Sequence, residues 1–221
     1  MKRTLLALAL AAVAACPAAA KIIKGVTVKN DGTVSVPKGT GAYVAPPPHV
    51  KGAHVIYSNI ARKYPEGLYF CCAGAIVAGP TSALNMQDWA AIQFTPTADA
   101  TVQEIDVPVQ QIAGAATINF GLYADKAGLP GSVLMQFQAT GFGLTGSCCN
   151  LAVGKNRKGV PVKGGTPYWI ALTTDSSAPD ALANWPSNSS DIVDLLPTAV
   201  NQGSGWQSFS YNPMAFAVYG H

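Results

Sequence analysis

The feature that most constrains this fold is an alternation of apolar and polar residues with a period of two, repeated along most of the chain. In the segment QEIDVPV, Ile105, Val107 and Val109 alternate with Glu104 and Asp106. Successive side chains of a strand point to opposite faces. The segment therefore predicts a strand whose apolar face packs on a core while the two acids lie on a solvent-exposed face.

The same period recurs in TINFGLY, SVLMQFQ, PYWIALTT and MAFAVYG. Between the first two of these segments lies ADKAGLPG, in which Asp, Gly and Pro-Gly favour a tight reversal and predict a β-hairpin. Charged residues make up only 11% of the chain, and it contains 22 glycines and 16 prolines. We predict an all-β domain over residues 54–221, folded as a two-sheet antiparallel sandwich of jelly-roll type.

The N-terminal segment MKRTLLALALAAVAACPAAA has the pattern of an export signal. A basic start is followed by an apolar run too short to span a bilayer, and then by small residues that suit a signal peptidase. We therefore interpret residues 1–20 as a signal peptide and expect a secreted or cell-surface protein. The alternative to a simple signal peptide is that VAAC is a lipobox. Cys16 would then be lipidated, and the protein would be an outer-membrane or periplasmic lipoprotein.

The charge of the chain argues against a nucleic-acid partner. Removal of Lys2 and Arg3 with the signal peptide lowers the number of basic residues from 14 to 12, against 11 acidic residues. A nearly neutral chain lacks the excess of positive charge that proteins use to bind nucleic acid or an anionic membrane. No other apolar run reaches the length of a transmembrane segment.

Residues 21–53 differ from the rest of the chain. VTVKNDGTVSV predicts a hairpin, because an Asn-Asp-Gly turn lies between alternating valines. The three prolines at 46–48 favour a stiff linker. We expect this region, a hairpin followed by a Pro-rich linker, to be a mobile or loosely docked N-terminal arm.

Four of the five cysteines form two adjacent doublets, Cys71–Cys72 and Cys148–Cys149. Outside the cytosol such a set is typical of disulfides, and zinc bound by four thiolates is the alternative. Two of the three pairings join the doublets across a loop of about 77 residues, which would stabilise the fold by roughly 4 kcal/mol. The third forms two strained rings of neighbouring cysteines. We favour the clamp between the doublets.

Several segments from residue 54 to residue 220 resemble the bacterial choice-of-anchor R domain. They include WAAIQFTP, TVQEIDVPV, LYADKAGLPGSVL, GGTPYWIALTT, ANW and GSGWQSF, of which LYADKAGLPGSVL is the most specific. The resemblance implies an exported β-sandwich module without an assigned enzymatic activity. The family offers no catalytic residues that could be transferred to this chain.

Catalytic patterns are weak. His49, His54 and His221 lie in or beside a linker or at the terminus, where no Ser-His-Asp arrangement is expected. Glu104 and Asp106 are two residues apart on one strand, whereas a glycosidase places its two acids across a cleft. We therefore predict no catalytic residues and no enzymatic activity.

Two groups of residues are candidates for binding. The segment TTDSSAPDALANWPSNSSDIVD is rich in oxygen ligands and predicts a weak structural calcium site, with no other cofactor. Its acidic members are Asp175, Asp180, Asp191 and Asp194. Large aromatic side chains near predicted loops can stack on sugar rings while amides bind hydroxyls. The candidate saccharide-binding residues are Trp185, Trp206, Tyr211 and Asn184.

Packing at the ends of the sandwich is the alternative role of these tryptophans. Trp89 and Trp169 lie inside predicted strands, and we expect them in the core or on a sheet face. Taken together, these patterns predict an exported, non-catalytic module with a structural, adhesive or polysaccharide-binding role. The alternatives are a carbohydrate-active hydrolase that uses acids of the 175–194 segment and a lipid-anchored binding protein.

Overall fold

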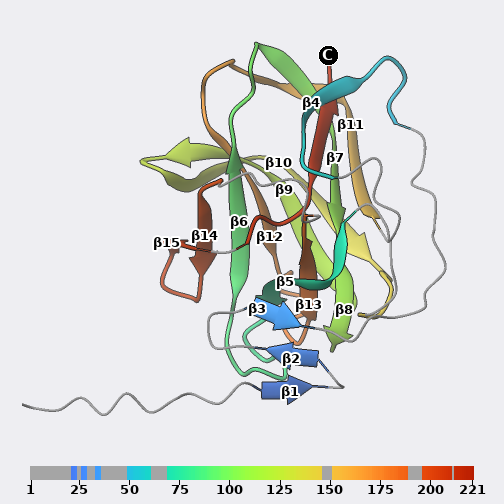
Figure 1. Ribbon diagram of the computed structural model, residues 1–221, viewed down its shortest axis with the longest axis vertical. Helices are drawn as coiled ribbons and strands as arrows, with labels where there is room; N and C mark the ends of the chain where they lie inside the picture. Colours follow the sequence, from blue (N-terminus) through green and yellow to red (C-terminus); the bar gives the residue numbers. More distant parts are fainter. Residues whose placement is uncertain are drawn as a thin grey trace, which may run out of the picture.

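The computed structural model shows an all-β protein. It describes residues 21–23, 26–28, 33–35, 49–60, 69–145, 151–188, 196–210 and 212–221, with the first three ranges and residues 70–72 described by their backbone alone. Within these ranges the chain forms sixteen strands, all paired antiparallel, and no helix. The predicted all-β antiparallel sandwich is confirmed, but the prediction had two sheets and the strands form three. The strands divide into three hydrogen-bonded sheets, which Figure 1 shows around one core.

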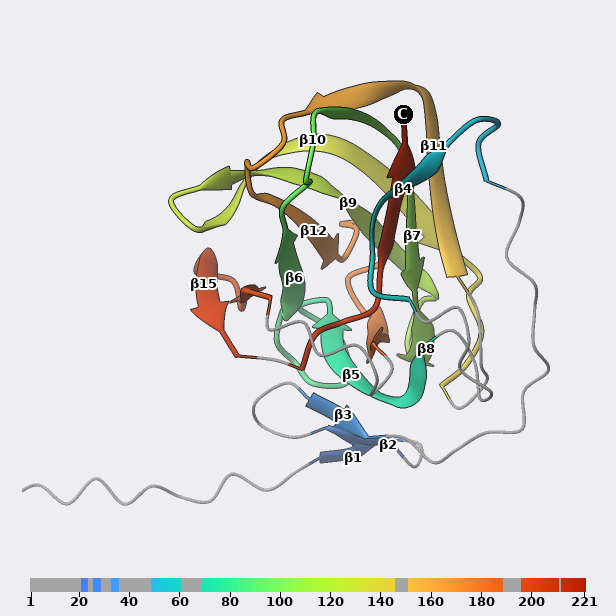
Figure 2. The same ribbon diagram turned by 45° about the horizontal axis from the view of Figure 1, so that its top comes forward.

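Sheet C has six strands and forms one wall of the sandwich. In spatial order they are β10 (Leu129–Thr140), β9 (Thr117–Lys126), β12 (Tyr168–Thr173), β6 (Trp89–Phe94), β14 (Thr198–Asn201) and β15 (Trp206–Phe209). The edge strands β10 and β15 also contact each other, so the sheet is strongly curled, as Figure 2 shows.

Sheet B has four strands and carries the acidic strand of the sequence. Its order is β11 (Leu151–Val162), β7 (Ala100–Pro108), β16 (Ala217–Gly220) and β4 (His54–Ser58). The acidic strand β7 is therefore central, with a hydrogen-bonded neighbour on each side. A central strand can be covered on both faces when another segment crosses its outer surface.

Sheet A contains the N-terminal strands. Its order is β1 (Lys21–Ile23), β2 (Val26–Val28), β3 (Thr33–Ser35), β5 (Phe70–Ala78), β13 (Leu182–Ser187) and β8 (Gln110–Ala113). The antiparallel pairing of β2 with β3 confirms the predicted hairpin. The expectation of a loosely docked arm is wrong, because β3 pairs with β5 through Val34 and Gly74 and so extends the sheet (Figure 1).

The main core lies between the sheets and matches most of the predicted apolar faces. Val133 is the exception: it is 49% exposed, because the register of β10 against β9 shifts between Val133 and Met135. Ile105, Val107 and Val109 are fully buried. The apolar positions of β9 are buried as well: Ile118, Phe120 and Leu122. At about 25 cal/mol per Å² of apolar surface removed from water, these side chains drive the packing of the sheets.

The predicted hairpin between β9 and β10 is confirmed, and its turn lies inside the predicted segment 124–131. Lys126 pairs with Leu129, so the turn residues are Ala127 and Gly128, both with positive φ (55° and 80°). This is the geometry of a two-residue type I′ turn, whose twist matches that of the flanking strands. The Asp125 Oδ2 accepts a hydrogen bond from the Gly128 N–H at 3.0 Å and supports the reversal.

No helix in the described ranges has the length and apolarity needed to cross a bilayer.

Candidate functional site

Three adjacent strands of sheet B place three polar side chains in one row. Glu104 of β7 pairs with Lys155 of β11 on one side and with Tyr219 of β16 on the other. Directly paired residues project to the same face of a sheet, so these side chains lie beside one another. The Lys155 Nζ lies 3.8 Å from the Glu104 Oε2 and partly neutralises its charge.

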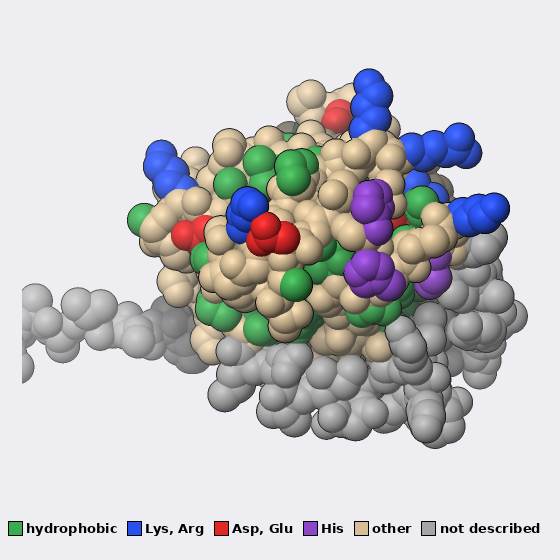
Figure 3. Space-filling model, turned by 90° about the horizontal axis from the view of Figure 1, so that it is seen from above, with side chains coloured by type: hydrophobic (Ala, Val, Ile, Leu, Met, Phe, Trp, Pro, Cys, Tyr) green, Lys and Arg blue, Asp and Glu red, His purple; other side chains and the backbone are tan. Residues whose placement is uncertain are grey.

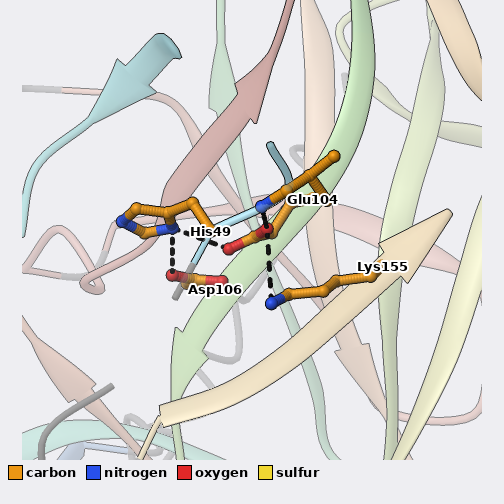
Figure 4. Close-up of polar contacts among 5 residues, drawn as sticks. His49, Glu104, Asp106 and Lys155 are labelled. Atoms are coloured by element: carbon orange, nitrogen blue, oxygen red, sulfur yellow. Dashed lines mark hydrogen bonds and ion pairs between the residues drawn. The ribbon is translucent and has the colours of Figure 1, made fainter. Parts of the chain in front are cut away.

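His49 completes this arrangement from a different part of the chain. Its Nδ1 lies 2.7 Å from the Glu104 Oε1 and 4.0 Å from the Asp106 Oδ2. The next residue, Val50, donates its backbone N–H to the Glu104 Oε2 at 2.8 Å. The imidazole also packs on the Tyr219 ring, with centroids 4.0 Å apart. In Figure 4, the Nδ1 faces the two carboxylates and the other ring nitrogen points away from them.

The burial of the two acids corrects the sequence prediction. Glu104 is 0% and Asp106 1% exposed, whereas both were expected on a solvent-exposed face. The segment that carries His49 and Val50, together with the side chains from β11 and β16, crosses this face of β7 and covers it. His49 itself remains 42% exposed at its side chain, so the cluster opens to solvent at the imidazole.

Asp106 is the least satisfied member of the cluster. Its Oδ1 is buried and has no hydrogen-bond partner. Burial is the main reason that the pKa of Asp106 is raised to about 7, and repulsion from the neighbouring Glu104 carboxylate adds to it. His49 and Lys155 act in the opposite direction and lower this pKa. A buried carboxyl group of this kind retains a proton or requires another positive charge.

One ligand atom from each of His49, Glu104 and Asp106 lies within 4.8 Å of the others, so the three residues could hold a metal ion. Among the described residues this is the only such group of three. Figure 3 shows that all three histidines of the chain, drawn in purple, gather on one face of the molecule. Of these, His49 alone joins the carboxylates in that group.

The structure does not support two of the four predicted saccharide-binding residues. Trp185 is 0% exposed, and its indole N–H donates to the Ala215 carbonyl at 2.8 Å. Asn184 is also 0% exposed, and its amide donates to the Gln110 Oε1 at 3.1 Å. Both residues lie on β13, a central strand of sheet A, so they pack in the interior and cannot stack on a sugar from outside.

Trp206 has a different environment. On sheet C it pairs with Asn201, which pairs in turn with Trp89 on the next strand. The two tryptophan side chains are half-buried, and their ring centroids lie 6.5 Å apart. The Trp89 indole N–H donates to the Thr174 Oγ1 at 3.0 Å, and the Gln87 amide lies 3.3 Å from the Asn201 Oδ1. We call Trp89, Asn201 and Trp206 the tryptophan row.

The predicted calcium ligands are not brought together in the described residues. The Asp175 Oδ1 accepts hydrogen bonds from the backbone N–H and the hydroxyl of Ser177, and its Oδ2 accepts one from Asn119. These bonds lower the pKa of Asp175 to about 2. Asp180 is exposed and belongs to no group of three potential ligands among the described residues. Asp175 therefore stabilises a turn.

Several predicted residues lie outside the described ranges: the signal peptide at 1–20 with Cys16, the prolines at 46–48, Cys148, Cys149, Asp191, Asp194 and Tyr211. The backbone of Cys71 and Cys72 lies in β5, but their side chains are outside the described part. The predicted disulfides therefore stay a prediction.

No family model, no curated protein and no solved structure matches this chain. The resemblance to the choice-of-anchor R domain stays an interpretation of the quoted segments.

The cluster around His49 was not predicted as a site. Sequence spacing gives no link between His49 and Glu104, which are 55 positions apart. The signals in the sequence were weak: two acids at alternate positions of a predicted strand, and a histidine that is one of only three in the chain.

Proposed function

We propose that the protein is an exported, non-catalytic β-sandwich module that binds polysaccharide through the tryptophan row. The observation that carries this proposal is the direct pairing of Trp89, Asn201 and Trp206 across three neighbouring strands. Half-buried indole faces stack on the apolar faces of sugar rings. The Asn201 Oδ1 already accepts the Gly203 and Gly205 N–H groups, so its amide nitrogen is the group that would donate to hydroxyls. Export rests on the predicted signal peptide.

The strands that present the row also carry a surface depression. It has a volume of about 390 Å³ and is lined by residues of β14, β15 and the segments that flank them: Leu196, Pro197, Thr198, Ser208, Phe209, Ser210 and Pro213. None of these residues belongs to the tryptophan row. Leu196 and Phe209 pack on the main core, whereas Trp206 packs on a separate cluster around Trp169, so the depression is not part of the proposed binding surface.

A non-catalytic role is favoured by the placement of the buried acids. Glu104 and Asp106 are neighbours on one face of a strand, with His49 between them and solvent. A glycosidase needs two carboxyl groups on opposite sides of the scissile bond. The hydrolase alternative would therefore have to use other acids.

The test is a pull-down of the purified protein with insoluble cellulose, chitin and starch, measured for the wild type and two variants. We expect Trp206→Ala and Trp89→Ala to weaken binding at least about ten-fold, which corresponds to about 1.4 kcal/mol of lost stacking. Leu134→Ala is the matched control, because Leu134 is an exposed apolar residue (37%) on β10 at the other edge of sheet C.

Circular dichroism of each variant shows whether the fold is intact. The proposal is wrong if none of the three polysaccharides retains the wild type. It is also wrong if folded Trp206→Ala binds as well as the Leu134→Ala control.

A further inference from the structure

We propose that His49, Glu104 and Asp106 form a binding site for a divalent metal ion of the zinc type, independent of the polysaccharide-binding surface. The site is assembled from two distant parts of the chain. β7 supplies both carboxylates, and the segment before β4 supplies the imidazole.

The donor set indicates the class of metal. An imidazole nitrogen with two carboxylate oxygens suits first-row divalent ions such as Zn²⁺, whereas Ca²⁺ takes six to eight oxygen ligands. Three protein ligands leave a position open for water, and the half-exposed His49 side chain gives the ion a path from solvent. The single histidine and the coordination position left for water distinguish this site from a closed structural site made of four side chains.

The distances allow the ion to fit with small movements. Ligands about 2.1 Å from a tetrahedral zinc ion are roughly 3.4 Å from one another. The Nδ1 of His49 lies 2.7 Å from the Glu104 oxygen and 4.0 Å from the Asp106 oxygen, so the two separations bracket this value. All three ligand atoms lie within 4.8 Å of one another, so small shifts of the side chains would bring them to coordination distance. Binding replaces the hydrogen bond between the His49 Nδ1 and the Glu104 Oε1, and the imidazole then carries its proton on Nε2 so that Nδ1 can coordinate the ion.

The unpartnered oxygen of Asp106 is a second, independent indication of a ligand. Asp106 is 1% exposed, and its Oδ1 has no hydrogen-bond partner. Figure 4 shows the carboxylate group directed toward His49 and Glu104. The oxygen nearer to His49 is the other one, Oδ2. A buried carboxylate oxygen without a partner is costly, and an ion bound by both oxygens of Asp106 would remove that cost.

The charges around the cluster are compatible with a bound dication. Two carboxylates face one ammonium group, that of Lys155, whose Nζ is 3.8 Å from Glu104. When the imidazole is neutral and Asp106 is ionised, the cluster therefore has a net negative charge, which a dication would offset. Because Glu104 also accepts the Val50 N–H, its orientation is fixed before an ion arrives. Binding would fasten the segment at 49–50 to sheet B.

The experiment is isothermal titration of the tag-free full chain with zinc chloride, because an affinity tag of histidines would itself bind zinc. We expect one zinc ion per chain in the wild type. His49→Ala and Asp106→Asn should each lower the affinity about ten-fold or more. His54→Ala is the matched control, because His54 is an exposed histidine outside the group of three.

Two further measurements test whether the ion is bound at this site. Cobalt(II), added in place of zinc, gives a visible absorption band from the bound ion, and this band should disappear in His49→Ala. Thermal unfolding with and without zinc should show a higher Tm only where the site is intact. Since His49 is half-exposed, His49→Ala is expected to fold even if Asp106→Asn does not.

The proposal is overturned if zinc gives no saturable binding, which would leave His49 and Glu104 as a plain ion pair. It is also overturned if His49→Ala and His54→Ala bind zinc equally, because the ion would then be held elsewhere, for example by cysteines. Saturable binding of calcium without zinc would contradict the metal class. None of these outcomes depends on polysaccharide binding.

Discussion

Two aspartates, Asp88 and Asp106, each have a buried side-chain oxygen without a hydrogen-bond partner, but their surroundings differ. Asp106 lies beside His49 and Lys155, which supply positive charge. At Asp88, the only side chain that lowers the pKa is Gln202, whose amide lies 3.4 Å from the carboxylate. Asp106 is therefore suited to binding a cation, whereas the burial of the Asp88 carboxylate destabilises the folded state.

Asp88 predicts a pH dependence of stability. Burial raises its pKa from 3.8 to about 7, so between these values the unfolded chain ionises while the folded protein keeps the proton. The contribution of Asp88 to stability is therefore fully present below about pH 4 and is lost as the pH rises to about 7. Asp88→Asn removes this titration. From pH 5 to pH 7, the wild type should lose about 2 to 3 kcal/mol relative to the variant.

Urea unfolding of both proteins at pH 5 and pH 7 measures this difference. Asp106 titrates in both proteins, so its contribution cancels in the comparison. If the free energies of unfolding of the variant and the wild type differ by the same amount at pH 5 and at pH 7, Asp88 does not titrate between these pH values.

The buried acids also show where sequence analysis fails at single residues. Alternation correctly predicted that Ile105, Val107 and Val109 face the core. It wrongly assigned Glu104 and Asp106 to solvent, because a period of two distinguishes the faces of a strand but does not reveal a distant segment that covers the second face. Likewise, the burial of Trp185 follows from its position on a central strand, which its loop-like sequence neighbourhood did not indicate.

At the scale of elements, the turn between β9 and β10 shows that the hairpin was predictable and its register was not. The segment predicted to hold the reversal was 124–131, yet Pro130 already pairs with Asp125 inside the ladder. The turn instead places Ala127 at a φ of 55°, a left-handed conformation that costs a residue with a Cβ about 1–2 kcal/mol. Asn tolerates this conformation better, and Asn-Gly is a preferred pair in type I′ turns.

Ala127→Asn should therefore stabilise the protein by about 0.5–1 kcal/mol. Ala127 is exposed, so no packing is lost on substitution. The measurement is thermal unfolding at neutral pH, with a higher Tm expected. Ala127→Val is the opposite control, because a β-branched residue is strained at positive φ and should lower the Tm. A Tm for Ala127→Asn at or below that of the wild type would contradict the assigned turn.

On the scale of the whole molecule, the chain is held together by pairings between distant segments. β5 pairs with β3 on one side and with β13 on the other, and the His49 segment is attached to β7. Local sequence patterns predicted the strands, since propensity and alternation act within a few residues. Apart from the two hairpins, they did not predict which strands pair, because that choice depends on how three sheets together cover the core.

The predicted disulfides would add a covalent link to this arrangement. β5 carries Cys71 and Cys72, and Cys148 and Cys149 come shortly before β11. Bridges between the doublets would tie sheet A to the segment that leads into sheet B, across a loop of about 77 residues. Such a link restricts the unfolded chain far more than rings within each doublet, which close almost no loop.

Reduction should therefore lower the free energy of unfolding by about 4 kcal/mol, whereas rings within the doublets would leave it nearly unchanged. Urea unfolding with and without a phosphine reductant measures the change. A variant with all four cysteines replaced by serine is the control, because the reductant should not affect it. Peptide mapping under non-reducing conditions identifies the pairing directly. Four free thiols in protein isolated from outside the cytosol would refute the disulfides between the doublets. Peptides linked only within a doublet would show that neighbouring cysteines form the strained rings instead.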